Sequence, residues 1–503
     1  MAATATAATL IGVSACTDES GAAANKSNAG SLAFATTFGP LISFDPWLSP
    51  SGDNPTIIMN QMVYDSLTHV TPNGKVTPSL ATSWKYTDPK TMVLKLRKGV
   101  KFDDGTPLDA AAVKANFDYA KKAVPAGQRT GYIAALTSTV VDPTTLELKS
   151  PTPQPDLPTD FATGGGYIVN PKALKHPSSL KAKPDGSGPY KLTQATSGQE
   201  WNFSRRAGHW DANDYPYQKL TMRNYSSVQA LDNAMKAGQV QAGVGQMSFL
   251  GSDRAAGLNI HTSSPTTVSG VWLNDRAGKI SPALGKVKVR QALNHAVDRA
   301  AIQKAVFHGI GKPASLIVPK GIDGFDATAN AKYTYDPKKA KKLLAEAGYP
   351  NGFSFTYMSG ADDPMAQAVA GYLRKVGVKM KIATRTSDYA QQLRSGKWAA
   401  SGFSYTMVPP LQSMSELLAP KGPGNFNRST DPEIQAQLKT AQEAPADTRK
   451  SAAEKLVTTV NDKAWFMILS HNPTIYVTGK KVTCEIGQRS VCPLYTFRPT
   501  QEK

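Results

Sequence analysis

The hydrophobic positions of this chain change period several times, and the first clear change lies in its first quarter. Residues 92–96 carry Met, Leu and Leu at alternate positions, which is the pattern of a strand with one buried face. An Asp-Asp-Gly turn follows at 103–105. Asp109 then precedes a helix in which Val113 and Phe117 share one face. The pattern predicts a compact strand, turn and helix unit.

Similar boundaries occur elsewhere in the chain. A first strand is predicted at 32–37, and a helix over 336–348 begins with Asp-Pro and ends with Gly. Another helix begins at Asp363-Pro364 and ends at Gly377, and a strand follows at 378–382. A strand-like run at 465–477 is expected to lead the chain back to its first part. The alternation of helices and strands indicates an α/β unit with a mostly parallel sheet.

Residues 64–119, taken in order, resemble the signature of the family 5 extracytoplasmic solute-binding proteins, which are the peptide, nickel and opine receptors of ATP-driven importers. The turn at 186–190 and the helix at 289–299 resemble the same family, and the resemblance spans about 32–482. It implies a two-lobed α/β fold of the periplasmic-binding-protein-like type II, in the large cluster with an extra subdomain. The lobes are expected to be joined by crossing hinge strands, one of them at 271–274.

The resemblance also implies a division of the chain in which the first lobe is built from both ends and the second from the middle. We expect a signal peptide at 1–15, a lipidated tether at 16–31, the first lobe at 32–60, 181–268 and 470–503, its extra subdomain at 61–180, and the second lobe at 269–469.

Size and composition fit a soluble globular protein, with 503 residues, 40% of them hydrophobic and 19% charged. The net charge of +19 raises nucleic acid, anionic lipid and acidic ligands as partners. Lys and Arg are scattered without a long basic run or zinc-finger spacing, so we predict no nucleic-acid partner and interpret the charge as a solvated surface. No stretch approaches the roughly 20 apolar residues of a membrane span.

The three cysteines each have a predicted place. Cys16 ends Val-Ser-Ala-Cys after a short apolar stretch, which resembles a lipobox and implies lipidation at Cys16; a chance Cys in an Ala-rich leader is the alternative. No Lys or Arg precedes that stretch, so the start of the signal peptide departs from the usual pattern. Cys484 and Cys492 bracket a short loop, where we predict a disulfide over two free thiols or a metal pair.

The ligand is expected between the lobes, where the resemblance shows a departure. Peptide-binding relatives carry a Trp followed three residues later by an Asp that pairs with the α-ammonium group of the peptide. Here Phe403 and Thr406 stand at those places, and Pro409 replaces a second Asp. A neutral hydroxyl cannot replace a buried carboxylate as the partner of an ammonium ion. The predicted ligand-binding residues, for which core packing is the alternative, are Phe44, Trp47, Trp272, Asn274, Phe403, Tyr405, Thr406 and Met407.

These observations favour an extracytoplasmic receptor of an ABC importer. It would be a lipid-anchored monomer that captures a peptide-like or other small amphipathic solute by hinge closure and delivers it to a membrane permease. No metal, cofactor or catalytic residue is predicted, because the seven His are widely spaced and no Gly-x-Ser-x-Gly or His-Glu-x-x-His sequence occurs. The alternatives are a secreted hydrolase with dispersed catalytic residues, a receptor for oligosaccharide, and a surface chaperone or adhesin on the same fold.

Overall fold

The computed structural model describes residues 29–37, 43–48, 54–124, 131–360, 363–385, 388–407, 409–487 and 492–500. The predicted signal peptide, Cys16 and residues 17–28 of the predicted tether lie outside these ranges. The first strand begins at Ala29, three residues before its predicted start, so the last residues assigned to the tether belong to the folded part.

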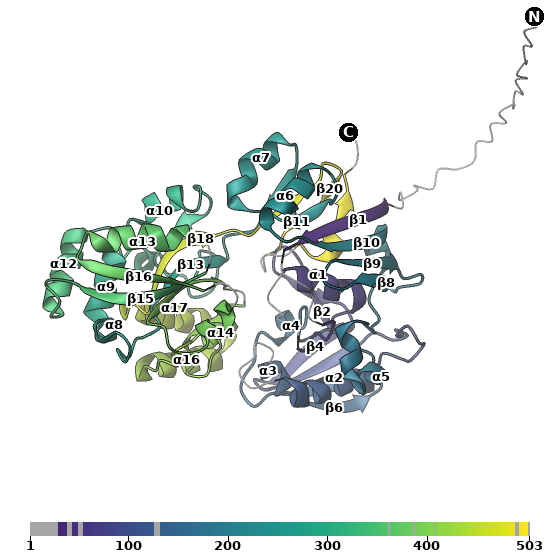
Figure 1. Cartoon of the computed structure of the whole chain (residues 1–503). Coiled ribbons are helices and arrows are strands. Elements are labelled where there is room, and N and C mark those ends of the chain that lie inside the picture. The colour runs from purple at the N-terminus through teal and green to yellow at the C-terminus, as the bar shows by residue number, and fades with distance from the viewer. Residues whose placement is uncertain are drawn as a thin grey trace, which may run out of the picture.

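The chain forms two lobes with separate sheets, and a smaller third sheet lies beside the first lobe (Figure 1). The sheet of the first lobe contains strands from both ends of the chain, whereas the sheet of the second lobe contains strands from its middle. The fold is therefore the expected two-lobed α/β fold.

The first-lobe sheet has seven strands in the order β12-β19-β11-β1-β10-β9-β8. Its centre is parallel, because β1 pairs in parallel with both β10 and β11, while the outer pairs are antiparallel. The strands are β1 (Ala29–Thr36), β8 (Tyr190–Thr196), β9 (Glu200–Arg205), β10 (Tyr217–Asn224), β11 (Ala242–Val244), β12 (Asn259–Thr262) and β19 (Ile475–Thr478).

The subdomain has a four-stranded antiparallel sheet in the order β4-β5-β7-β6, with the helix α2 packed against it. The alternation predicted at 92–96 is present, since Met92 and Leu94 are buried and Lys95 is exposed. Asp109 caps α2 as predicted, accepting a hydrogen bond from the backbone N of Ala112 at 3.0 Å. The strands of this sheet are β4 (Ala81–Asp88), β5 (Thr91–Leu96), β6 (Thr137–Asp142) and β7 (Thr145–Lys149), and β2 (Thr68–Val70) and β3 (Val76–Pro78) form a separate two-stranded sheet.

The helices of the first lobe and its subdomain are mostly short. They are α1 (Asn54–Val63), α2 (Ala110–Ala123), α3 (Gly131–Ala134), α4 (Leu157–Asp160), α5 (Pro171–Leu174), α6 (Val228–Lys236) and α7 (Leu250–Ala255), with the 3-10 helices η1 (Pro177–Lys181), η2 (Ala212–Asp214), η3 (Met247–Phe249) and η4 (Leu494–Thr496).

The second-lobe sheet has six strands in the order β14-β18-β13-β17-β15-β16. The prediction of a mostly parallel sheet is wrong here. Among the described strands, β16 and β17 pair in parallel with β15, whereas β13 is antiparallel to both β17 and β18, and β14 is antiparallel to β18. The strands are β13 (Thr267–Trp272), β14 (Lys312–Pro313), β15 (Phe353–Ser359), β16 (Val378–Thr384), β17 (Ala400–Thr406) and β18 (Phe466–Asn472).

Helices cover both faces of this sheet and form two separate cores. One layer contributes to the core around Val271 and Leu293, and the other to the core around Trp272 and Leu417. The first layer contains α8 (Pro282–Gly285), α9 (Val287–His295), α10 (Arg299–Ala305), α12 (Pro337–Glu346) and α13 (Pro364–Arg374). The second contains α11 (Ala327–Asn330), α14 (Tyr389–Leu393), α15 (Pro410–Leu418), α16 (Pro432–Glu443) and α17 (Ala446–Asp462).

Two crossing segments join the lobes. Residues 263–266 connect β12 with β13, and residues 473–474 connect β18 with β19. They are tied together, since the backbone N of Ser263 donates to Thr474 O at 3.0 Å and the N of Thr474 donates to Ser263 Oγ at 2.9 Å. The prediction of a crossing at 271–274 is wrong. The chain crosses at 263–266, just before β13, so Trp272 lies at the end of β13 that is away from the hinge.

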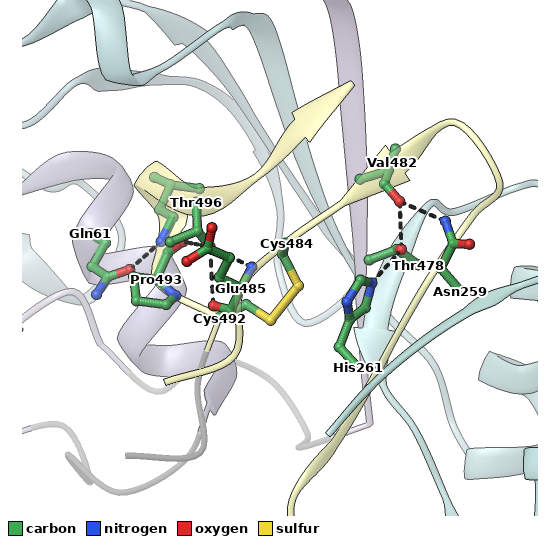
Figure 2. Close-up of a disulfide and its surroundings, with 11 residues drawn as sticks. Gln61, Asn259, His261, Thr478, Val482, Cys484, Glu485, Cys492, Pro493 and Thr496 are labelled. Carbon is green, nitrogen blue, oxygen red and sulfur yellow. Dashed lines mark hydrogen bonds between the residues drawn. A yellow bond between two sulfur atoms is a disulfide. The ribbon is translucent and has the colours of Figure 1, made fainter. Parts of the chain in front are cut away.

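The C-terminal segment returns to the first lobe and carries a disulfide between Cys484 and Cys492, whose Cα atoms lie 6.0 Å apart (Figure 2). The short strands β20 (Val482–Thr483) and β21 (Arg498–Pro499) pair on either side of it. Beyond the disulfide, the N of Leu494 donates to Gln61 Oε1 on α1 at 2.8 Å, and Leu494 and Phe497 lie in the core of the first lobe. The disulfide therefore holds a segment that completes that core.

Candidate functional site

Two of the predicted ligand residues, Phe44 and Trp47, connect two cores of the first lobe. Phe44 is buried in the core of the main sheet, and Trp47 in the core of the subdomain, where its ring lies 5.8 Å from that of Phe117. The hydroxyl of Tyr64 donates to Phe44 O at 2.7 Å. Neither side chain reaches solvent, so in this structure both pack the first lobe to its subdomain.

Three other predicted residues, Trp272, Asn274 and Met407, are also buried. The ring of Trp272 makes edge contacts with Phe403 at 5.4 Å and Phe466 at 5.1 Å. Asn274 Nδ2 donates to Ser401 Oγ at 3.0 Å. Trp272 therefore supports the ring of Phe403 from inside the lobe.

Phe403 and Tyr405 are half-buried on one face of β17. The Phe403 ring lies 5.9 Å from that of Tyr405 and 5.4 Å from that of Phe426. The Tyr405 hydroxyl donates to the carboxylate of Glu416 on α15. These contacts form an aromatic cluster, consisting of Trp272, Phe403, Tyr405, Phe426 and Phe466, that reaches the surface at Phe403 and Tyr405.

Thr406 lies on the opposite face of β17, because side chains alternate along a strand. Its hydroxyl lies 3.1 Å from that of Thr267, and the hydroxyls of Ser404 and Ser269 lie 2.8 Å apart beside them. The sequence placed Thr406 with Phe403 and Tyr405, whereas the structure separates them. The hydroxyl row of Thr267, Ser269, Ser404 and Thr406 was not predicted, since it requires the register between β13 and β17.

The hinge end of β17 is attached directly to a crossing segment. The backbone N of Met407 donates to Thr266 O at 2.9 Å, and Thr406 pairs with Thr267, the first residue of β13. A change in the direction of residues 263–266 therefore acts on β17 through the main chain.

The second lobe also has a basic cavity of about 420 Å³, which no sequence pattern indicated. It is lined by Arg394, Pro420, Lys421, Gly422, Pro423, Asn425, Phe426 and Arg428. Phe426 belongs to both the cavity wall and the aromatic cluster, so the cavity adjoins the cluster.

The first lobe has a more apolar cavity of about 210 Å³ at the carboxyl ends of the parallel strands β1 and β11. Thr36, Val244 and Phe249 are among its lining residues. Asp253 lies at its wall, and Lys236 Nζ lies 3.4 Å from Asp253 Oδ1. Burial, and after it the neighbouring Asp232, raise the pKa of the Asp253 carboxyl to about 6 against the opposing effect of Lys236.

Within the described ranges, no group of three or more His, Cys, Asp or Glu side chains is placed to hold a metal ion. In the same part of the chain, no helix is long and apolar enough to cross a membrane.

The chain has two lobes with separate sheets, two crossing segments that join them, and a cavity in each lobe. This arrangement is that of a two-lobed binding protein. Residues 75–425 match the family described as bacterial extracellular solute-binding proteins, family 5 Middle, and the chain belongs to this family. It is a solute-binding protein of the kind that serves ABC importers, as the resemblance implied. The family is a transport family and is extracytoplasmic.

Curated relatives support the same assignment. The glutathione-binding protein GsiB of Escherichia coli O1:K1 is 31% identical over 349 residues, which cover 67% of this chain and 66% of that protein. The aligned part thus spans about two thirds of that relative.

Solved structures share the whole fold. DppA from Helicobacter pylori, in complex with the peptide STSA, has a TM-score of 0.82 at 20% identity, covering 95% of this chain and 99% of that chain. The substrate-binding protein CtaP from Listeria monocytogenes has a TM-score of 0.81 at 22% identity, covering 94% and 100%.

Proposed function

We propose that this chain captures a small amphipathic solute of peptide-like size between its lobes and delivers it to a membrane permease. Two relatives bind ligands of this kind, namely the glutathione-binding protein GsiB and DppA with its bound peptide STSA. The crossing segments at 263–266 and 473–474 support a hinge motion, because a few loop residues between two packed lobes can absorb a change in backbone direction.

One observation carries the proposal. The segment 403–407 presents half-buried Phe403, Tyr405 and Thr406, and the same segment is hydrogen-bonded to the crossing residue Thr266. A solute bound to this segment could therefore influence the orientation of the crossing segment through the hydrogen bond between Met407 and Thr266. Phe403 and Tyr405 supply apolar contact on one face of β17, and the hydroxyl row supplies uncharged hydrogen-bonding groups on the opposite face.

In this proposal, Thr406 does not bind the free α-ammonium group of a peptide ligand. A hydroxyl cannot neutralise an ammonium ion, and the Thr406 hydroxyl already lies 3.1 Å from that of Thr267. We expect blocked or modified peptides, or other amphipathic solutes of similar size, to bind at least as well as peptides with a free N-terminus.

The remaining expectations belong to the same proposal. The protein would be lipidated at Cys16, held outside the cytoplasmic membrane by a tether, monomeric and without catalytic activity. Two acyl chains on Cys16 would give stable membrane attachment, which a single chain does not.

Thermal-shift measurements test this function directly. The probes are glutathione, the tripeptide Ala-Phe-Ala with free and acetylated N-termini, and maltotriose. A solute at 100 times its Kd should stabilise the folded protein by about 2.7 kcal/mol. Tyr405→Phe should change the affinity for a stabilising solute, whereas Tyr335→Phe, at an exposed Tyr on the same lobe, should not.

The proposal is contradicted if no probe raises the melting temperature, and native mass spectrometry of gently purified protein also finds no retained solute. Turnover of a peptide or glycoside by the purified protein would instead favour the hydrolase alternative.

A further inference from the structure

The basic cavity of the second lobe combines three cations with no acidic wall residue. Arg394, Lys421 and Arg428 are its charged residues, and none of them forms an ion pair within the part of the chain that the structure describes. Some other cations of this lobe are paired with acids: Lys463 Nζ, for example, lies 2.7 Å from Asp431 and 3.0 Å from Glu433. The cavity therefore concentrates uncompensated positive charge in a concave place, where it can attract an anion.

The wall of the cavity is held in place by Asn425, which is 2% exposed. Its Nδ2 donates to Ser429 O at 2.8 Å and to Ala419 O at 3.1 Å, and its Oδ1 accepts from the N of Ser429 at 2.9 Å. Arg428 has a φ of 52°, a left-handed conformation that non-glycine residues seldom adopt. The backbone of the loop is thus fixed by buried hydrogen bonds, and the loop carries the exposed side chains of Lys421 and Arg428.

The cavity also adjoins the proposed solute surface. Phe426 lines the cavity and packs against Phe403 at 5.4 Å. Arg394 directly follows α14, which lies on the side of the second lobe turned toward the first (Figure 1). A solute stacked on Phe403 can place a polar end at these cations.

We propose that the basic cavity binds an oxyanion group, a carboxylate or a phosphate, carried by the captured solute. This inference rests on the proposed function and specifies its ligand as an acidic amphipathic molecule. The three cations are exposed, so each contributes modestly and in a salt-dependent way. Guanidinium groups also match the geometry of a carboxylate or phosphate with two parallel hydrogen bonds.

Two matched pairs of probes separate the possible anions. The carboxylate pair is N-acetyl-Ala-Phe-Ala and its C-terminal amide, and the phosphate pair is glucose 6-phosphate and glucose. Binding is measured by calorimetry at low and high salt. We expect the acid of at least one pair to bind about tenfold more tightly than its neutral partner at low salt, and this preference should shrink at high salt.

Charge-neutralising variants locate the effect. The triple variant R394Q/K421Q/R428Q should lose about tenfold in affinity for the preferred acid and keep its affinity for the neutral partner, which also verifies that the variant is folded. The matched control K338Q/K341Q/K379Q removes the same charge from exposed sites of the second lobe outside the cavity, and it should bind like the wild type.

The inference is overturned if neither acid is preferred, if the cavity variant keeps the preference, or if both triple variants lose it equally. If the neutral probes bind and the acids bind no more tightly than their neutral partners, only this inference fails. If no member of either pair binds and the melting temperature never rises, the receptor proposal fails with it.

Discussion

Removal of the disulfide between Cys484 and Cys492 should destabilise the first lobe by a definite amount. The two residues are eight apart in sequence, and closing a loop of that length removes unfolded-state entropy worth about 2.5 kcal/mol in the chain-entropy model. The effect should reach the lobe as a whole, because Leu494 and Phe497 beyond the bridge are buried in its core. The ring of Phe497 lies 5.0 Å from that of Phe34 on β1.

The assay is urea unfolding of the wild type and of C484S/C492S, each with and without reductant, followed by tryptophan fluorescence. The wild type should lose about 2–3 kcal/mol on reduction and then resemble the double variant. Reductant should not change the double variant, and Cys16→Ser should behave like the wild type. A difference below about 0.5 kcal/mol, the size of an ordinary surface substitution, would refute the reasoning.

Three further predictions concern single residues. In thermal melts, Asp253→Asn should stabilise the protein at pH 8 and have little effect at pH 4. The raised pKa of Asp253 means that the folded protein favours the protonated acid. The contribution of this carboxyl to folding stability is therefore fully present below about pH 4 and is lost as the pH rises through about 6. Asp109→Ala should cost about 1 kcal/mol by removing the cap of α2. Gly352→Ala should destabilise by at least about 2 kcal/mol more than Gly309→Ala: both glycines have positive φ, but a Cβ at Gly352 would lie 1.8 Å from Gly377 O, whereas one at Gly309 meets nothing within 4 Å. Equal behaviour of the asparagine variant at both pH values, an unchanged melting temperature for the alanine variant at 109, or equal losses at the two glycines would each contradict the corresponding argument.

The sequence was informative wherever a short segment determines its own conformation. Asp109 and Asp336 cap their helices as predicted, because the capping hydrogen bond joins residues only three positions apart. The alternation at 92–96 is a property of one strand and its buried face. The family resemblance supplied the two-lobed arrangement, which no single segment encodes.

The candidate site was less predictable, because it depends on which face of a sheet is covered. Trp272 and Trp47 are large aromatics near the expected cleft, yet both are buried, and only the packing of helices around them decides this. Thr406 follows Tyr405 by one residue and therefore points to the other face of β17. The cations of the basic cavity are separated by 27 and 7 residues, at 394, 421 and 428, and the fold alone brings them together.

The most direct test of the account is small-angle X-ray scattering of the protein with and without a saturating solute that raises its melting temperature. The central claim is that the lobes rotate about residues 263–266 and 473–474 and close on the solute. We predict that the radius of gyration falls when this solute is added and recovers when it is removed by dialysis. A solute that stabilises the protein but leaves the scattering curve unchanged would contradict the claim.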